Sequence, residues 1–130
     1  MPLTLIKETG EALEDANSYA TAADGDAYHD GHLYATAWTA ASSENKEKAL
    51  VFATLLIDVT IHFNGAKSST TQALQWPRTG APDPDRNAAI TSILQTLATG
   101  ACFQPDEIPR DLVHATCEMA RELLVQASYL

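Results

Sequence analysis

The stretch SSENKEKALVFATLLIDVTI, residues 42–61, decides the fold class of this chain. Ser42 or Ser43 can cap a helix, and Glu44 suits its first turn and can pair with Lys48 one turn later. The apolar residues that follow cover nearly every face of the helix. We therefore expect it to be buried on several sides, either as the central helix of the fold or also against a neighbouring subunit. One face consists of Leu50, Ala53, Ile57 and Ile61, and Asn64-Gly65 is expected to end the helix.

Helical patterns on both sides of this stretch predict a mainly α fold. Thr21 can cap a helix over residues 22–30, and a second short helical piece is expected over residues 32–40. A last helix is expected to begin at Pro109 and to run nearly to Leu130. Residues 3–7 alternate apolar and polar side chains, which predicts a short N-terminal strand. The sequence thus predicts a small helical bundle with long loops.

Length and charge limit the classes of function. A chain of 130 residues with 45% hydrophobic residues fits one globular domain, residues 1–130. Its net charge is −9, and its first 30 residues hold one lysine against seven acidic residues. Because affinity for nucleic acid depends on Lys and Arg at phosphates, tight DNA binding by the isolated chain is not expected. No apolar run approaches the roughly 20 residues that span a bilayer, so a soluble protein made in a cytoplasm is expected.

The histidines and cysteines do not form a recognisable catalytic set. His29 and His32 lie close to acidic residues, which permits a metal corner, but Gly31 between them favours a solvated surface cluster instead. His62 and His114 fall on apolar helical patterns and are expected in the core or in an interface. Cys102 and Cys117 are expected to be free thiols. The chain has no phosphate-binding loop and no nucleophile motif, so no enzyme activity, metal or cofactor is expected.

The loop Trp76-Pro77-Arg78-Thr79-Gly80 carries the most demanding side chains. Trp76 needs burial and a partner for its N–H, and Arg78 offers five donors that suit loop carbonyls or a carboxylate. Two interpretations remain open at this point. The loop either fills the protein's own core or also contacts a neighbouring subunit. The residues expected to anchor the loop or to form the subunit interface are Trp76, Pro77, Arg78 and Gly80.

Several segments resemble one phage protein family. They are DANSY at residues 15–19, ADGDAY at 23–28, TQALQWPRTG at 71–80, and Ile108-Pro109 followed by ATCEMA at 115–120. Members are often labelled DnaT-like single-stranded-DNA-binding proteins, and the family is the head–tail connector (adaptor) family of tailed bacteriophages. The resemblance covers most of the chain in the same order, and DANSY and QALQWPRTG are its specific parts.

This resemblance implies a subunit of a homo-oligomeric ring, commonly a dodecamer, in the neck of the virion. The ring would lie below the portal protein, extend the channel for genomic DNA without binding it specifically, and join the next neck or tail protein. No membrane is involved. The resemblance also implies that the end of the last helix docks on the portal. The implied docking residues are Val125, Gln126, Ala127, Ser128, Tyr129 and Leu130.

One segment departs from the family's pattern. Residues 81–107 are longer than the corresponding connection and include a helical pattern over residues 87–99. The insertion could wrap a neighbouring subunit, reach the next ring or decorate the outside. Because its apolar stripe is not expected to stay in water, a docking partner is expected for it. The stripe consists of Ile90, Ile93, Leu94 and Leu97.

Two other classes of function compete with the connector. A single-stranded-DNA-binding module would need a basic groove with stacking aromatic residues, whereas this chain is acidic and only 7% aromatic. A small enzyme would have to rely on the His29 and His32 cluster. A different neck component, such as a stopper or tail-completion protein, stays close to the connector hypothesis.

Overall fold

The structure is a computed structural model that describes residues 3–84 and 102–127. Its helices are α1 (Ala22–His29), α2 (Thr36–Thr39), α3 (Ser43–Thr60) and α5 (Arg110–Ala127). Two short strands, β1 (Ala66–Lys67) and β2 (Arg78–Thr79), pair in antiparallel fashion. The described part is therefore mainly α, as the sequence predicts.

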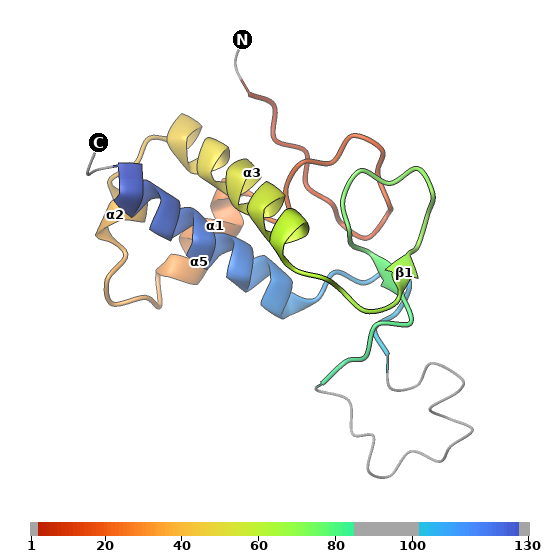
Figure 1. Cartoon of the computed structure of the whole chain (residues 1–130). Helices are drawn as coiled ribbons and strands as arrows, with labels where there is room; N and C mark the ends of the chain where they lie inside the picture. The colour runs from red at the N-terminus through yellow and green to blue at the C-terminus, as the bar shows by residue number, and fades with distance from the viewer. Residues whose placement is uncertain (1–2, 85–101, 128–130) are drawn as a thin grey trace.

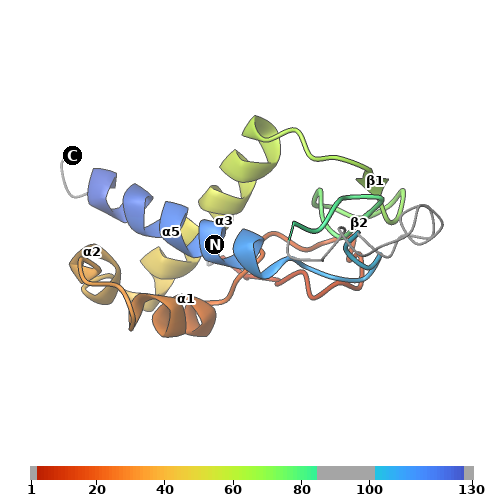
Figure 2. The same ribbon diagram turned by 90° about the horizontal axis from the view of Figure 1, so that it is seen from below.

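The two long helices, α3 and α5, pack against each other and form the centre of the helical half (Figure 1). Seen from below, α1 and α2 cover one side of α5, and the β1–β2 pair lies with the long loops at the other end of the molecule (Figure 2). Small residues let α3 and α5 approach closely. The buried residues of this helical core are Ala20, Trp38, Ala49, Leu50, Ala53, Cys117 and Ala120.

Helices α1 and α3 begin at capping residues that the sequence predicts. The Thr21 side chain accepts a hydrogen bond from the Asp24 backbone, and the Asp24 carboxylate accepts one from the Thr21 backbone, which completes a capping box at α1. The Ser42 hydroxyl accepts from the Asn45 backbone N–H at the start of α3. Each of these caps satisfies backbone donors that a helix start leaves without an intrahelical partner.

Trp38 is the largest side chain in the helical core, and Gly25 makes room for it. Its ring is fully buried against α1, and its indole N–H donates to Asp26 at 2.9 Å. Lys46 also contacts that carboxylate, at 2.9 Å. A Cβ at position 25 would overlap the Trp38 ring, so this contact requires glycine even though glycine weakens a helix interior.

We expect Gly25→Ala to lower the free energy of unfolding by about 1–3 kcal/mol, because an added methyl overpacks the core against Trp38. Gly31→Ala is the matched control, since a Cβ there meets only the Tyr28 carbonyl oxygen, at 3.9 Å. Urea unfolding monitored by circular dichroism measures both variants. Equal stability of the two variants would contradict the role assigned to Gly25.

The second half of the molecule is held by a buried carboxylate and by aromatic packing. The Glu8 carboxylate is fully buried and accepts hydrogen bonds from the backbone N–H groups of Gly10, Ala12 and Leu13 at 2.8–2.9 Å. It thereby organises a loop that has no regular secondary structure. A second core lies beside this loop and consists of Tyr19, Ile57, Trp76, Ala81 and Leu112.

Three sequence predictions about secondary structure are wrong in detail. Residues 3–7 form only an isolated bridge between Lys7 and Ser18, because the Asn17 side chain takes the position of a ladder partner for Ile6. The second helical piece shrinks to α2, since the Tyr34 N–H donates to the His32 ring and not to a helical carbonyl. The central helix ends at Thr60 and not at Asn64-Gly65, because the β-branched residues at its end favour extended backbone. Ile61 is therefore half exposed and not part of the inner face.

The two described ranges, residues 3–84 and 102–127, contact each other at the ends of the predicted insertion. Pro82 and Cys102 form an isolated antiparallel bridge, and the Phe103 N–H donates to the Ala81 carbonyl at 2.9 Å. Ala81 is buried and Phe103 packs against Trp76, so this contact belongs to the second core. The stripe of Ile90, Ile93, Leu94 and Leu97 lies outside the described residues, and its docking stays a prediction.

Candidate functional site

The loop around Trp76 is buried in its own subunit. Trp76 and Arg78 are almost completely buried, Pro77 is fully buried after a cis peptide bond, and Gly80 adopts a positive φ of 82°. The Trp76 ring meets Phe63 and Phe103 edge to face, at centroid distances of 5.6 and 5.4 Å. The loop therefore fills the protein's own core. Whether it also contacts a neighbouring subunit stays a prediction.

Arg78 organises the chain between α3 and the loop. Its guanidinium donates to the backbone carbonyls of Phe63, Asn64 and Gly65, and to the Gln75 carbonyl and side-chain oxygens, over 2.8–3.3 Å. All five N–H donors are thereby used within the subunit. This arginine is consequently saturated and cannot serve as a phosphate-binding group without breaking the loop.

We expect Arg78→Lys to lower the free energy of unfolding by about 1–3 kcal/mol, because an ammonium group cannot satisfy the carbonyls that the guanidinium fork reaches. Arg110→Lys is the matched control on an exposed side chain, and its effect should stay within about 0.5 kcal/mol. Chemical unfolding of both variants measures the difference. A loss of stability no larger for Arg78→Lys than for Arg110→Lys would contradict the anchoring role.

Tyr19 connects the same loop to α3. Its hydroxyl donates to Asp58 at 2.6 Å and accepts from the Trp76 backbone N–H at 3.2 Å, while Asp58 also accepts from the Gln75 backbone N–H. The indole N–H of Trp76, for which the sequence predicts a partner, is buried without one within the described residues. Burial, together with the contact to Asp58, raises the pKa of Tyr19. Burial also raises the pKa of Asp58 despite the hydrogen bonds it accepts. The pair acts as a structural clamp, because each oxygen has a partner inside the subunit.

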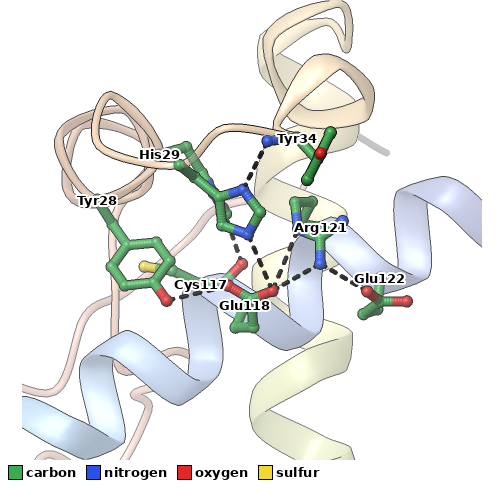
Figure 3. A network of polar contacts seen from close by, with 8 residues as sticks. Tyr28, His29, Tyr34, Cys117, Glu118, Arg121 and Glu122 are labelled. Carbon is green, nitrogen blue, oxygen red and sulfur yellow. Dashed lines mark hydrogen bonds and ion pairs between the residues drawn. The ribbon is translucent and has the colours of Figure 1, made fainter.

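A second polar network lies where the loop between α1 and α2 meets α5 (Figure 3). Glu118 accepts from the Tyr28 hydroxyl at 3.0 Å and from Arg121 at 2.6 Å, and it approaches His32 Nε2 at 3.4 Å. The Tyr34 N–H donates to the other nitrogen of the His32 ring at 3.0 Å. Glu118 thus ties the loop that carries Tyr34 to the surface of α5.

His29 is buried and not solvated, contrary to the prediction of a surface cluster. Its Nε2 lies 3.0 Å from the Cys117 carbonyl oxygen, to which it donates, and its ring packs against Trp38 at a centroid distance of 5.0 Å. Its buried Nδ1 has no hydrogen-bond partner within the described ranges. The residues described also hold no cluster of three or more potential metal ligands. His62 and His114 are exposed, so neither lies in the core, and a position in an interface stays a prediction for both.

We expect acid to destabilise the fold through His29. Burial lowers its pKa, because the imidazolium would lose its water, while the carbonyl of Cys117 and the charge of Glu118 only partly oppose this shift. The unfolded chain therefore binds more protons than the folded chain below about pH 6.5, and stability falls as the pH falls. The neighbouring groups His32 and Arg121 also disfavour protonation.

Urea unfolding between pH 7.5 and pH 5 measures this loss as a decreasing free energy of unfolding. His29→Gln keeps a donor for the Cys117 carbonyl and removes the titrating group, so its stability should depend less on pH. His114→Gln, at an exposed histidine, should retain the pH dependence of the wild type. The same pH dependence in the wild type and in His29→Gln would exclude His29 as its source.

Besides Ile61 and Met119, the exposed large apolar side chains of the described ranges gather in two places. On α3, Phe52, Leu55 and Val59 are 50%, 55% and 70% exposed, and they recur at helical spacing on the outer face. On the loop between α1 and α2, Leu33 and Tyr34 are 83% and 76% exposed. Patches of this kind commonly mark sites of interaction.

A groove of about 390 Å³ runs beside the outer face of α3. Its walls are formed by Val51, Leu55 and Val59 on one side and by residues 16–17 and 73–75 on the other. A separate hollow of about 240 Å³ lies between Phe52 and the α5 residues Leu123 and Leu124. Phe52 and Leu55 therefore border different depressions although they lie on the same helix.

Basic side chains in the described ranges are mostly paired within the subunit. Lys7, Lys46, Lys48, Arg110 and Arg121 each lie within 4.0 Å of a carboxylate. A groove that follows a phosphate backbone needs several unpaired cations along its length. The pairing of these groups disfavours such a groove on the described surface.

The predicted portal-docking residues lie at the end of α5. Val125, Gln126 and Ala127 form its last turn, while Ser128, Tyr129 and Leu130 lie outside the described residues. The sequence pattern assigned no functional role to Glu118, Leu33 or Tyr34. A signal existed for the last two, since a large apolar pair follows Gly31 and His32 in a polar stretch.

Comparison with known proteins identifies the family of the chain. A family model described as “putative DnaT-like ssDNA binding protein” matches residues 3–129, so the chain belongs to that family. No curated protein and no solved structure matches the chain. Within the described ranges, no helix is long and apolar enough to cross a membrane.

Proposed function

We propose that the chain is a structural subunit of a tailed-phage neck, a head–tail connector that assembles as a ring below the portal. The observation that carries this proposal is the outer face of α3, where large apolar side chains stay exposed although the helix already contributes a full inner face to the core. A surface of that kind suits contact between proteins better than contact with phosphates. The DANSY and QALQWPRTG segments add the resemblance to connectors.

The charge of the chain is compatible with a channel through which DNA passes. The net charge is −9, and most basic side chains of the described ranges are engaged inside the subunit. Such a surface repels phosphates and would let the genome slide without sticking. The proposed partners are further copies in the ring, the portal, and the next neck or tail protein. The role requires neither catalysis nor a cofactor.

Single-stranded-DNA binding is the second candidate, and the description of the matching family supports it better than it supports the connector. The exposed aromatic rings of Tyr34 and Phe52 could stack on bases. The charges of the chain support DNA binding less well, because phosphate binding requires accessible cations. A stopper or tail-completion protein would share the surface features of the connector.

Cryo-electron microscopy of intact virions tests the connector directly. We expect density for a ring of copies between portal and tail, with the end of α5 near the portal. Neck density that this chain cannot fit would exclude the connector.

Filter binding with single-stranded oligonucleotides at low salt tests the second candidate. We expect no retention above that of an unrelated acidic protein. Retention that decreases steeply with added salt would instead support DNA binding, because counterions are released when cations meet phosphates.

A further inference from the structure

We infer that neighbouring copies of this chain contact each other head to tail, with the Leu33–Tyr34 loop of one copy seated in the α3 groove of the next. This inference rests on the proposed ring and names the two surfaces that would build it. A ring formed by one repeated contact needs two different complementary patches on each subunit. The described surface offers two such patches, one protruding and one recessed.

The protruding patch is held in place before any contact forms. Leu33 and Tyr34 are the most exposed large apolar side chains within the described ranges. The Tyr34 N–H donates to the His32 ring, and that ring meets Glu118 on α5. A loop that is already ordered loses little conformational entropy on binding, so exposed apolar area there converts efficiently into affinity.

The recessed patch matches these side chains chemically. Its walls are apolar through Leu55, Val59 and Leu74, which suits a leucine and the body of a tyrosine ring. The same groove also presents polar groups of Asn17, Asp58 and Gln75. A tyrosine combines an apolar ring with a hydroxyl that seeks a partner, so it can satisfy both kinds of lining.

The positions of the two patches favour a head-to-tail contact over a symmetric one. The loop between α1 and α2 lies at one end of the helical half, whereas the loops that border the groove lie toward the β1–β2 end (Figures 1 and 2). Two copies joined through this contact would leave one loop and one groove free. Further copies can then be added until the ring closes.

Charge also limits where copies can meet. Copies with a net charge of −9 repel each other, so contact is favoured where few charges face the partner. Asp58 is the one charged residue that lines the groove, and Tyr19 and Gln75 already donate hydrogen bonds to it. Added salt should therefore strengthen self-association by screening the remaining repulsion, which is opposite to its effect on DNA binding.

Two double variants test the inference. Leu33→Ser with Tyr34→Ser removes the protruding patch, and Leu55→Ser with Val59→Ser removes the groove wall. All four side chains are more than half exposed, so both variants should fold, as thermal melting can verify. Phe52→Ser is the matched control, because Phe52 lies on α3 but borders the other hollow.

Analytical ultracentrifugation at high ionic strength measures the masses. The wild type and Phe52→Ser should form species larger than a dimer as concentration rises, and each double variant alone should stay monomeric. An equimolar mixture of the two variants should form a dimer and nothing larger, since one intact loop meets one intact groove. A reciprocal two-fold contact would give the same mixed dimer but would stop the wild type at a dimer, so only a head-to-tail contact produces both results.

Other outcomes would overturn the inference. If the wild type stays monomeric at the highest attainable concentration, this contact does not join copies of the chain by itself, and the inference is wrong. Microscopy of virions decides the connector role separately. Wild-type assembly that survives in both double variants would retain the ring but place its contacts elsewhere. If assembly is lost only when residues 86–100 are replaced by a Gly–Ser linker, that segment and not the Leu33–Tyr34 loop occupies the groove.

Discussion

The Tyr19 hydroxyl is the contact on which the arrangement of the two halves depends. It lies between Asp58 on α3 and the Trp76 backbone of the buried loop, and the Tyr19 N–H reaches Thr54 on the same helix. Tyr19 therefore contacts the central helix at two points and the buried loop at a third. The low polarity of this site strengthens each contact, and it also makes an unpaired group costly. The loop half has little regular secondary structure, so such side-chain contacts replace the backbone ladders of a sheet.

Helix α3 contributes apolar side chains both to the core and to the outer surface, because it is apolar on nearly every side. Its inner face packs on α5 through Ala49, Leu50 and Ala53, where small residues permit close approach. Its outer face leaves Leu55 and Val59 in solvent. A monomer gains nothing from that exposure, whereas an assembled protein gains the free energy of burying it. The family description names DNA binding, while the internal pairing of the basic side chains favours protein contacts.

Sequence reasoning succeeded where local chemistry decides the structure. The capping residues Thr21 and Ser42, the long apolar pattern of α3 and the final helix after Pro109 were all predictable, because caps and periodicity act over only a few residues. The burial of Trp76 and Arg78 could be anticipated as one of two alternatives. The choice between them required the contacts of Arg78 with residues 63–65, which no local pattern encodes.

The sequence by itself determined a small acidic protein with a mainly α fold, and it located the demanding loop at residues 76–80. Only the tertiary structure decided that His29 is buried, that Glu8 binds three backbone N–H groups, and that the His32 ring links Tyr34 to Glu118 on α5. These features join residues through folding and not through spacing along the chain. Their energies depend on burial, and burial is a property of the whole packed molecule.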